Sequence, residues 1–318
     1  MYLTLFIASL LIATLTTYIY KNIWNLFYNK NKIPTGYGLF LILFFYLYSF
    51  FFSTIDTELV AFSIILFFSL IYWVDDLLHL PFIFRFLLQF VCGCAIAIYL
   101  LIHAGNNIDV YFYTIVIFSG LINIFLSNVI NFYDGLDLNI STLIFILGIT
   151  IIFLADQSII DIKYGFIIIG FTFGFSIFNF KPDNIFFGDS GCFVVASFIN
   201  FLLIKSILVI NLDIIYLIIP LALPIIDVLY VIILRIYKNE SLLSRNYHHL
   251  YHQLQSRFNN KTYIIPQIFN AMALFIISKI VITTNIFDLK QNLLFILISF
   301  LFTIITYVLF KNLIRLKN

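Results

Sequence analysis

Residues 83–102 read IFRFLLQFVCGCAIAIYLLI, an almost unbroken apolar run. A helix needs roughly 20 such residues to cross the hydrocarbon core of a bilayer. Similar runs recur along the whole chain, since 63% of its 318 residues are hydrophobic and only 10% are charged. Soluble domains carry about 25% charged residues, so this chain has too little polar surface to coat a water-soluble globule. The composition therefore predicts a protein whose main solvent is the lipid bilayer.

Eleven apolar runs predict an all-α, polytopic transmembrane bundle of about 11 helices. The runs span approximately 2–20, 39–53, 59–74, 83–102, 111–127, 140–155, 164–180, 192–210, 214–236, 266–284 and 291–311. No internal repeat or separate soluble domain interrupts them, so we interpret residues 1–318 as one integral membrane domain. Because no basic residue precedes the first run and no small-residue cleavage site follows it, we expect a retained helix rather than a cleaved signal.

The basic residues are unevenly divided between the two sets of loops. If the N-terminus faces outside, the inner side carries 13 of the 17 Lys and Arg residues, namely Lys21, Lys30, Lys32, Arg85, Lys181, Arg235, Lys238, Arg245, Arg257, Lys261, Lys311, Arg315 and Lys317. The outer half keeps Lys163, Lys205, Lys279 and Lys290, and we expect Lys205 and Lys279 to extend toward the outer interface. Because cytoplasmic loops are rich in Lys and Arg, this distribution predicts an N-out, C-in orientation.

The acidic residues fall into two groups in the same arrangement. Those on the outer side are scattered singly, at Asp56, Glu58, Asp109, Asp156, Asp161, Asp213 and Asp288. Those on the inner side are mostly clustered beside Gly, Asn and His, at Asp75, Asp76, Asp134, Asp137, Asp183, Asp189, Asp227 and Glu240. Three separate inner loops thus bring aspartates to one membrane face, which predicts one composite site on the cytoplasmic side.

The first acidic block is WVDDLLHLP, residues 73–81, at the inner end of the third run. Asp75 and Asp76 are adjacent carboxylates, and like charges at one helix end repel each other. A bound cation or proton would relieve that repulsion. The alternative interpretation is a solvated helix end.

The second block is NVINFYDGLD, residues 128–137, after the fifth run. Asn128, Asn131, Asp134 and Asp137 recur every three residues, which places successive members on neighbouring positions of one helix face. Gly135 permits a turn or the close approach of a ligand. A polar cap on a helix end remains the alternative.

The third block is NIFFGDSG, residues 184–191, at the start of the eighth run. Asp189 lies next to Gly188 and close to Gly191, so the turn leaves backbone N–H groups for a phosphate and a carboxylate for Mg²⁺. The alternative is an ordinary helix N-cap.

The fourth block covers the ninth run and the loop after it. Asp227 is an acid near the inner end of a transmembrane helix, which is energetically costly and suggests function. Arg235 and Arg245 are candidates to hold phosphates. His248, His249 and His252 gather three of the five histidines within five residues. Loop solvation is the main alternative, and a zinc site is disfavoured because no cysteine joins the cluster.

Together the four blocks resemble the polyprenyl-phosphate N-acetylhexosamine-1-phosphate transferase family, in that family's order along the chain. The resemblance implies that Asp75 and Asp76 match an Asp-Asp pair that deprotonates the lipid phosphate or supports the metal. It implies that Asp189 ligates Mg²⁺, with Asp76 as a possible second ligand. The nucleotide and sugar would contact Asn128, Asn131, Asp134, Asp137 and Phe186, the last by stacking on uracil. His249 and His252 would hold the pyrophosphate, and Arg85 and Gln89 match residues of the O-antigen branch.

This resemblance predicts an enzyme that moves N-acetylhexosamine-1-phosphate from a UDP-sugar to undecaprenyl phosphate. The implied cofactor is Mg²⁺, with Mn²⁺ as a possible substitute. The implied partners are the UDP-N-acetylhexosamine, the polyprenyl phosphate, membrane lipid and, as an open possibility, a second copy of the chain, with no nucleic acid. The expected location is the bacterial inner membrane, with the active site facing the cytoplasm.

Four positions depart from the family pattern, and the first-loop block is reduced to PTGYG, residues 34–38, without its usual basic residue. Leu138 stands in place of a final glycine in the second block, and Cys192 follows Gly191 where serine is usual. Tyr251 replaces the middle histidine of the fourth block, and Asn246 replaces an aspartate. The missing histidine argues against the peptidoglycan branch and favours the branch that starts O-antigen or enterobacterial common antigen chains.

Three other functions remain open on the residues alone. A lipid-linked sugar transporter would suit eleven helices, although transporters place polar groups near the bilayer midplane rather than at helix ends. A catalytically degenerate scaffold would explain the four departures. A CDP-alcohol phosphatidyltransferase also uses an Asp-Gly start, but Leu136-Asp137 does not continue its motif.

Overall fold

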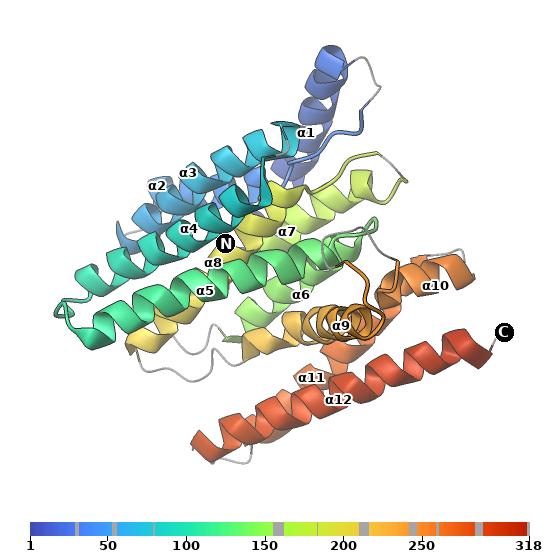
Figure 1. Cartoon of the computed structure of the whole chain (residues 1–318). Coiled ribbons are helices and arrows are strands. Elements are labelled where there is room, and N and C mark those ends of the chain that lie inside the picture. The colour runs from blue at the N-terminus through green and yellow to red at the C-terminus, as the bar shows by residue number, and fades with distance from the viewer. Residues whose placement is uncertain are drawn as a thin grey trace.

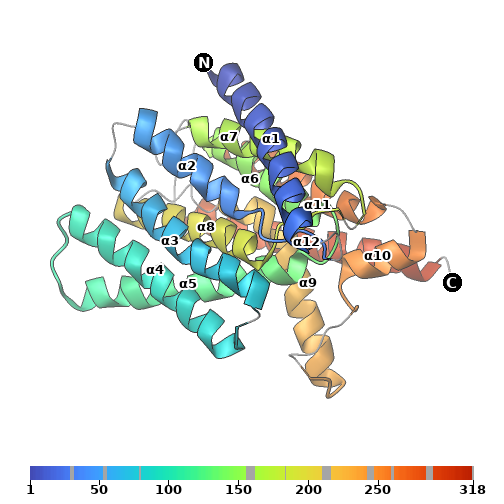
Figure 2. The ribbon, with the colours of Figure 1, turned by 90° about the horizontal axis from the view of Figure 1, so that it is seen from above.

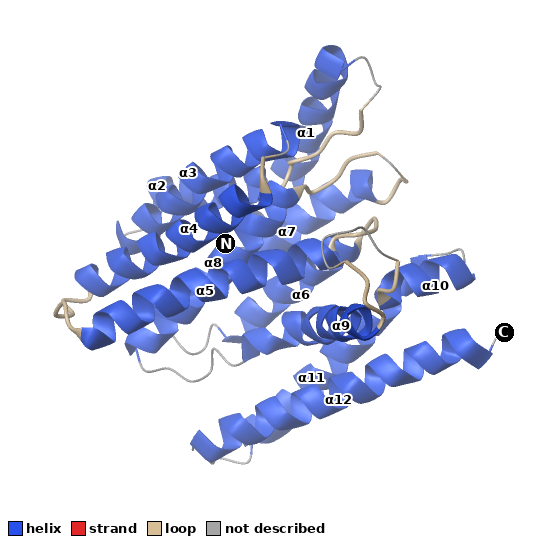
Figure 3. Ribbon diagram, viewed as in Figure 1, coloured by secondary structure: helices blue, strands red, loops and turns tan. Residues whose placement is uncertain are grey.

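The chain folds into helices throughout the part that the structure, a computed structural model, describes (Figure 1). The described residues are 1–28, 32–52, 56–78, 80–154, 162–182, 184–209, 216–241, 247–258, 261–283 and 289–316. The helices are α1 (Tyr2–Tyr28), α2 (Leu39–Phe52), α3 (Asp56–Leu78), α4 (Phe82–His103), α5 (Val110–Tyr133), α6 (Asn139–Leu154), α7 (Ile162–Asn179), α8 (Asp189–Val209), α9 (Ile218–Tyr237), α10 (Leu250–Phe258), the 3₁₀ helix η3 (Lys261–Ile264), α11 (Ile265–Thr283) and α12 (Leu289–Leu316). Figure 3 shows no strand among these residues, which confirms the predicted all-α class.

Each of the eleven predicted apolar runs forms a helix in the structure. Within the described residues, nine helices are long and apolar enough to cross a membrane, while α2 and α6 are shorter apolar helices. The protein is therefore membrane-embedded. The number of crossings and the N-out, C-in orientation stay predictions.

Helix α8 lies at the centre of the larger group of helices and contacts α2, α3, α4 and α5. Its side chains are largely apolar and most of them are buried, so its position is fixed by packing against several helices. Helices α9, α11 and α12 contact one another and form a second group beside it. Figure 2 shows the C-terminal part of α9 projecting from the side of the bundle.

Small residues allow α1 and α7 to pack closely. On α7, Gly170 and Gly174 lie one turn apart, and a methyl group on either would meet a backbone carbonyl of α1 at 2.5 or 2.7 Å. Small residues spaced by four are a common contact surface between membrane helices, because they let the backbones approach. This contact fixes α1, whose C-terminal end leads into the loop that reaches the polar end of the bundle.

The loops that follow α1, α3, α5, α7 and α9 gather at the end of the bundle where α10 and the C-terminus lie (Figure 1). These loops carry the four polar blocks of the sequence. The opposite end carries the α4–α5 turn. The fold thus collects the blocks at one end, as the sequence predicts, and leaves the apolar helix bodies between the two ends.

The structure corrects the expectation for Lys205 and Glu58 at the other end. Lys205 does not extend toward an interface, because its Nζ forms an ion pair with Glu58 Oε1 at 2.9 Å. Glu58 is not a loop residue but a buried residue of α3, and Tyr164 donates a hydrogen bond to its second oxygen at 2.6 Å. A charge inside a bundle is tolerated only when it is paired in this way.

Candidate functional site

Asp76 holds the start of α8 from the end of α3. Its carboxylate accepts hydrogen bonds from the backbone N–H of Asp189 at 2.9 Å and of Ser190 at 3.2 Å, and from the Ser190 hydroxyl at 2.6 Å. The first N–H groups of a helix have no partner within the helix, and its N-terminus favours negative charge. Asp76 therefore caps a helix that begins 113 residues later in the chain.

A close backbone contact fixes the turn before Asp189. Gly188 and Gly36 both have left-handed φ angles, +87° and +85°, which favour glycine. A methyl group on Gly188 would lie 2.6 Å from the Cα of Gly36. Hydrogen bonds from Phe186 N to the Pro34 carbonyl at 2.8 Å and from Gly38 N to the Phe187 carbonyl at 2.9 Å join the same two segments. The short glycine loop 34–38 thus supports the Asp189 turn directly.

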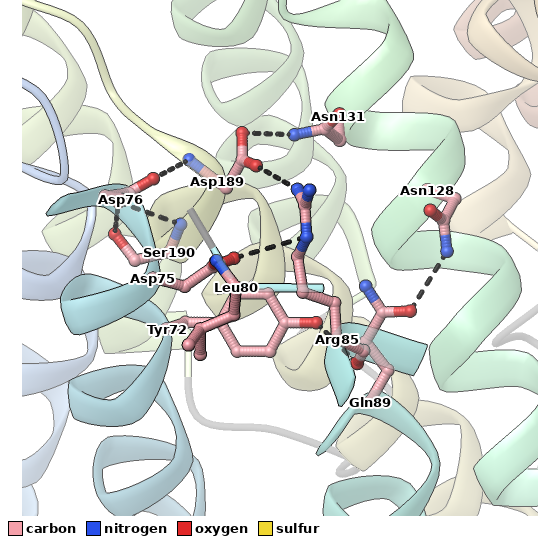
Figure 4. A network of polar contacts seen from close by, with 10 residues as sticks. All are labelled: Tyr72, Asp75, Asp76, Leu80, Arg85, Gln89, Asn128, Asn131, Asp189 and Ser190. Atoms are coloured by element: carbon pink, nitrogen blue, oxygen red, sulfur yellow. Dashed lines mark hydrogen bonds and ion pairs between the residues drawn. The ribbon is translucent and has the colours of Figure 1, made fainter. Parts of the chain in front are cut away.

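Asp189 lies between the second acidic block and Arg85. Its Oδ1 accepts a hydrogen bond from Asn131 Nδ2 at 2.6 Å, and its Oδ2 pairs with Arg85 Nη1 at 3.1 Å (Figure 4). The Asp189 side chain is 40% exposed, so its carboxylate remains reachable from outside. Residues from α4, α5 and α8 therefore meet at one carboxylate.

Asp75 points to the other side of Arg85. Its buried carboxylate accepts a hydrogen bond from Leu80 N at 2.6 Å, and its Oδ2 lies 3.5 Å from Arg85 Nε (Figure 4). The Tyr72 hydroxyl donates to the Arg85 carbonyl at 2.8 Å, which ties α3 to α4. Arg85 thus lies between two aspartates that come from different helices.

Two pockets of about 450 Å³ adjoin at Asp189 and Arg85, which line both of them. The first pocket lies between α4 and α5 and is otherwise lined by Tyr72, Phe82, Phe86, Gln89, Ser127, Asn128, Asn131, Phe132 and Phe193. The second lies among the loops and is otherwise lined by Lys32, Ile33, Thr35, Asp75, Asp76 and Phe186. One pocket is therefore largely aromatic and apolar with amides at its wall, and the other is acidic.

Asp134 ends α5 near this centre. Its Oδ2 accepts a hydrogen bond from the Cys192 thiol at 3.6 Å. Burial, with the nearby negative charge of Asp189, raises the pKa of Asp134 to about 7. A cation bound close to these carboxylates would remove that repulsion and favour the charged form.

Six of the twelve predicted site residues line these two pockets, namely Asp75, Asp76, Asn128, Asn131, Phe186 and Asp189. Asn128 donates to Gln89 Oε1 at 3.0 Å in the first pocket, and the Phe186 side chain is 37% exposed at the second. Asp137 is placed farther along the same loop, where its carbonyl accepts from Tyr263 at 2.8 Å. It does not line either pocket.

The histidine loop is docked on a different residue, Asp227. The buried Asp227 carboxylate contacts His249 Nδ1 at 2.8 Å and accepts hydrogen bonds from Leu250 N at 2.9 Å and from the Tyr307 hydroxyl at 3.1 Å. Asp227 thus holds the loop to both α9 and α12. A buried carboxylate needs such partners to offset its lost hydration.

Three of the four predicted phosphate ligands do not line the two pockets. Arg235 is buried and donates to the Ser241 carbonyl of its own loop. His249 is committed to Asp227, and the His252 ring lies 4.5 Å from the ring of Tyr251. Arg245 lies outside the described residues.

Three of the four departures from the family pattern have a structural counterpart. Leu138 has a left-handed φ of 66°, the conformation that a glycine adopts without strain. Cys192 supplies a donor to Asp134, as a serine hydroxyl would. Tyr251 donates to the Phe132 carbonyl at 2.6 Å and packs over Gly135, so it joins the histidine loop to the second block. Asn246 lies outside the described residues.

Sequence reasoning missed several residues that build the centre. Ser190 and Gly36 were not expected to bind or support the acidic residues. Arg85 was noted as matching the family, but its place between Asp75 and Asp189 was not. The signal for Arg85 was a lone cation near the inner end of an apolar run, nine residues after Asp76.

The carboxylates of the acidic centre are compatible with a magnesium ion, although the described residues do not supply a complete set of ligands. Among the described residues no group of three His, Cys, Asp or Glu side chains is arranged to hold a metal. Mg²⁺ prefers oxygen ligands and is usually bound by one or two carboxylates together with waters and substrate phosphates. The half-exposed Asp189 carboxylate, close to Asp76, offers such a partial set beside two pockets.

Fold and site together define the class of protein. It is a helical membrane protein with an acidic centre at one end of its bundle. Residues 58–207, which hold the centre, match the model of the family described as glycosyl transferase family 4. This part of the chain is thus similar to that family, which supports the resemblance seen in the sequence.

One relative at 29% identity is a protein of Bacillus subtilis (strain 168) named "Probable undecaprenyl-phosphate N-acetylglucosaminyl 1-phosphate transferase". The alignment covers 183 residues, which are 55% of this chain and 50% of the relative. The chain is thus matched over about half the length of that relative.

Proposed function

We propose that this protein transfers N-acetylhexosamine-1-phosphate from a UDP-sugar to a polyprenyl phosphate, releasing UMP. The observation that carries the proposal is the convergence of Asp75, Asp76 and Asp189 around Arg85, at the junction of two pockets. Two negatively charged reactants have to meet for this reaction. A junction that joins an aromatic, apolar pocket to an acidic one suits a lipid reactant on one side and a nucleotide on the other.

The chemistry requires one bond to form and one to break. An oxygen of the polyprenyl phosphate attacks the β-phosphorus of the UDP-sugar, the one that carries the sugar. The bond from that phosphorus to the bridging oxygen breaks, and UMP leaves with the bridging oxygen. Bound at Asp189, and with Asp76 close by, Mg²⁺ would neutralise the pyrophosphate and improve UMP as a leaving group.

The two adjacent aspartates suit different tasks in this scheme. Asp76 uses both oxygens to hold the start of α8, so it positions Asp189. Asp75 lines the acidic pocket, and its Oδ2 faces Arg85 across 3.5 Å. We therefore favour Asp75 over Asp76 as the group that accepts a proton from the lipid phosphate. Arg85, half-exposed at both pockets, would hold a phosphate oxygen of either reactant.

The nucleotide would lie in the acidic pocket against Phe186 and reach Asn131 and Asp134 across the Asp189 junction. Asn131 is fixed by Asp189, and Phe186 presents a half-exposed ring at the acidic pocket that is suited to stacking on a base. We propose UDP-N-acetylglucosamine or a related UDP-N-acetylhexosamine as donor and undecaprenyl phosphate as acceptor. The name of the Bacillus subtilis relative supports the N-acetylglucosaminyl 1-phosphate group and the undecaprenyl phosphate acceptor. We also propose that the active site faces the cytoplasm at the inner membrane, because Lys and Arg are more numerous in the loops on this side.

A transporter for lipid-linked sugars is a weaker proposal. Transporters place their binding residues near the middle of the membrane, often at broken helices. Here the acidic centre is formed at helix ends, by the last turn of α3 and the first residue of α8.

A product assay tests the proposed reaction. The purified protein, placed in liposomes that contain undecaprenyl phosphate and supplied with Mg²⁺, is incubated with each of several UDP-N-acetylhexosamines. We expect one or more donors to yield UMP and a lipid heavier than the acceptor by one phosphosugar. If the folded protein forms no such lipid with any donor, the proposal is wrong.

A further inference from the structure

A third cavity lies apart from the two pockets at Asp189, in a groove between α9 and α12. It has a volume of about 410 Å³ and apolar walls, formed among others by Leu229 and Ile233 of α9 and by Ile304 and Val308 of α12. These side chains are 42–66% exposed, so the groove opens to the surroundings of the helices. In a membrane-embedded bundle those surroundings are lipid chains.

Two cations line the same groove near the C-terminal end of α12. Lys311 and Arg315 are four residues apart, and therefore lie on one face of the helix. No acidic residue is among the residues that line the groove. The groove thus combines an apolar channel with a positive end, which is the charge pattern of a lipid with an anionic head group.

Lys311 is the strongest sign of a missing anionic partner. Its Nζ atom is buried and makes no hydrogen bond, although an ammonium group has three donors to satisfy. Its described contacts are with two aromatic rings, at 3.6 Å from the centroid of Tyr230 and 5.4 Å from that of Tyr307. Cation–π contacts of this kind hold an ammonium in place but leave its hydrogen bonds unmade.

The groove is separate from the proposed reaction site. None of the residues that line it lines either of the two pockets at Asp189. A reacting phosphate has to reach Asp189, so the acceptor lipid is not the best occupant of this groove. A lipid there would nevertheless touch Tyr307, whose hydroxyl donates to Asp227, the residue that docks His249.

We propose that this groove is a binding site for one anionic membrane phospholipid. An acyl chain lies between α9 and α12, and the head-group phosphate is held by Lys311 and Arg315. Basic pockets between membrane helices hold anionic head groups in this way, and each cation contributes to the attraction. This inference concerns a site of its own and holds whether or not the protein is the proposed transferase.

Native mass spectrometry of the full-length, delipidated protein in detergent tests the proposal. The protein is titrated with dioleoylphosphatidylglycerol, dioleoylphosphatidylcholine or undecaprenyl phosphate. We expect one phosphatidylglycerol to bind more tightly than phosphatidylcholine. Each single variant, Lys311→Gln or Arg315→Gln, loses one cation and is expected to bind phosphatidylglycerol about fivefold more weakly. Lys238→Gln is the matched control, because Lys238 is exposed at the end of α9 and does not line the groove.

A second variant keeps the charges and fills the channel. Leu229→Trp retains both cations, so loss of phosphatidylglycerol binding in this variant would show that the chain occupies the groove. Equal affinity of the wild-type protein for the two phospholipids would overturn the proposal. So would unchanged binding in Lys311→Gln, Arg315→Gln and Leu229→Trp, or a site that undecaprenyl phosphate fills in preference to phosphatidylglycerol.

Discussion

Asp76 shows how one side chain can serve both the fold and the site. It accepts three hydrogen bonds at the start of α8, and Asp189 is the first residue of that helix. The cap therefore determines where the Asp189 carboxylate points. The same contact explains why a charged residue persists at a partly buried helix end, since the unpaired N–H groups of a helix start are suited to a carboxylate.

Asp76→Asn tests this double role. An amide cannot accept all three hydrogen bonds, so we expect a loss of about 1 kcal/mol of stability together with a large fall in turnover. Asp109→Asn is the matched control, because Asp109 caps α5 through the Phe112 N–H at 2.9 Å, and α5 starts at the other end of the bundle. Thermal unfolding and UMP release are measured for both. Equal turnover in the two variants would argue against a positioning role for Asp76.

Leu138 is a strained residue at a position where the family has glycine. A left-handed φ costs a residue with a side chain roughly 1 kcal/mol or more. We expect Leu138→Gly to unfold at a higher temperature than Leu138→Ala, because both lose the leucine side chain but only glycine relieves the strain. The two melting temperatures decide the point, and an alanine variant as stable as the glycine variant would contradict it.

At the scale of elements, the apolar runs of the sequence predict the helices well. Length and composition decide a membrane helix, and both are visible in the sequence. Helix α10 escaped prediction because it is short and lies in the longest loop. Glu58 was placed in a loop because a charge ended the apolar run there, whereas its partner Lys205 lies 147 residues away and no local pattern connects the two.

The candidate site was predicted only in part, because local sequence patterns do not show contacts between distant residues. The polar blocks identified Asp75, Asp76, Asn131 and Asp189, because clustered polar residues at helix ends are rare in so apolar a chain. Partners far apart in sequence could not be predicted, such as Asp76 with the start of α8. Arg235 and His249 were expected to bind phosphate. In the structure Arg235 donates to the Ser241 carbonyl and His249 contacts Asp227, and their phosphate role stays a prediction.

Asp227 anchors the histidine loop to helices α9 and α12. Asp227→Asn removes the charge that pairs with His249, and we expect it to destabilise the protein by about 1.5–3 kcal/mol, as for hydrogen bonds to charged groups. Tyr307→Phe removes one of the three contacts and is expected to cost only about 1 kcal/mol. Thermal unfolding of both purified variants is the measurement. If Tyr307→Phe lowered the stability as much as Asp227→Asn, Asp227 would not be the main anchor of the loop.

At the scale of the whole molecule, the acidic centre and the Glu58–Lys205 pair lie on the same central helices. The pair joins α3 to α8, with side chains only 3% and 19% exposed. Asp76 joins the same two helices at the acidic end. The two contacts together hold α3 against α8 along its length.

A double-mutant cycle tests the buried pair. Lys205→Met leaves Glu58 charged and unpaired, and breaking such a pair costs about 3–5 kcal/mol. The double variant Glu58→Gln with Lys205→Met leaves no unpaired charge, so we expect it to be more stable than Lys205→Met alone. Thermal unfolding of the four proteins gives the coupling. Additive effects of the two substitutions would show that the pair does not stabilise the bundle.

The central claim is that the carboxylate of Asp189 serves the transfer of a phosphosugar. The most direct test is the rate of UMP release by wild-type protein and Asp189→Asn, both in liposomes with undecaprenyl phosphate, Mg²⁺ and the UDP-sugar that gives a lipid product. We predict that the variant folds and loses turnover by at least about 100-fold, since electrostatic stabilisation by a bound metal is worth several kcal/mol. A folded Asp189→Asn protein that releases UMP at the wild-type rate would contradict the account.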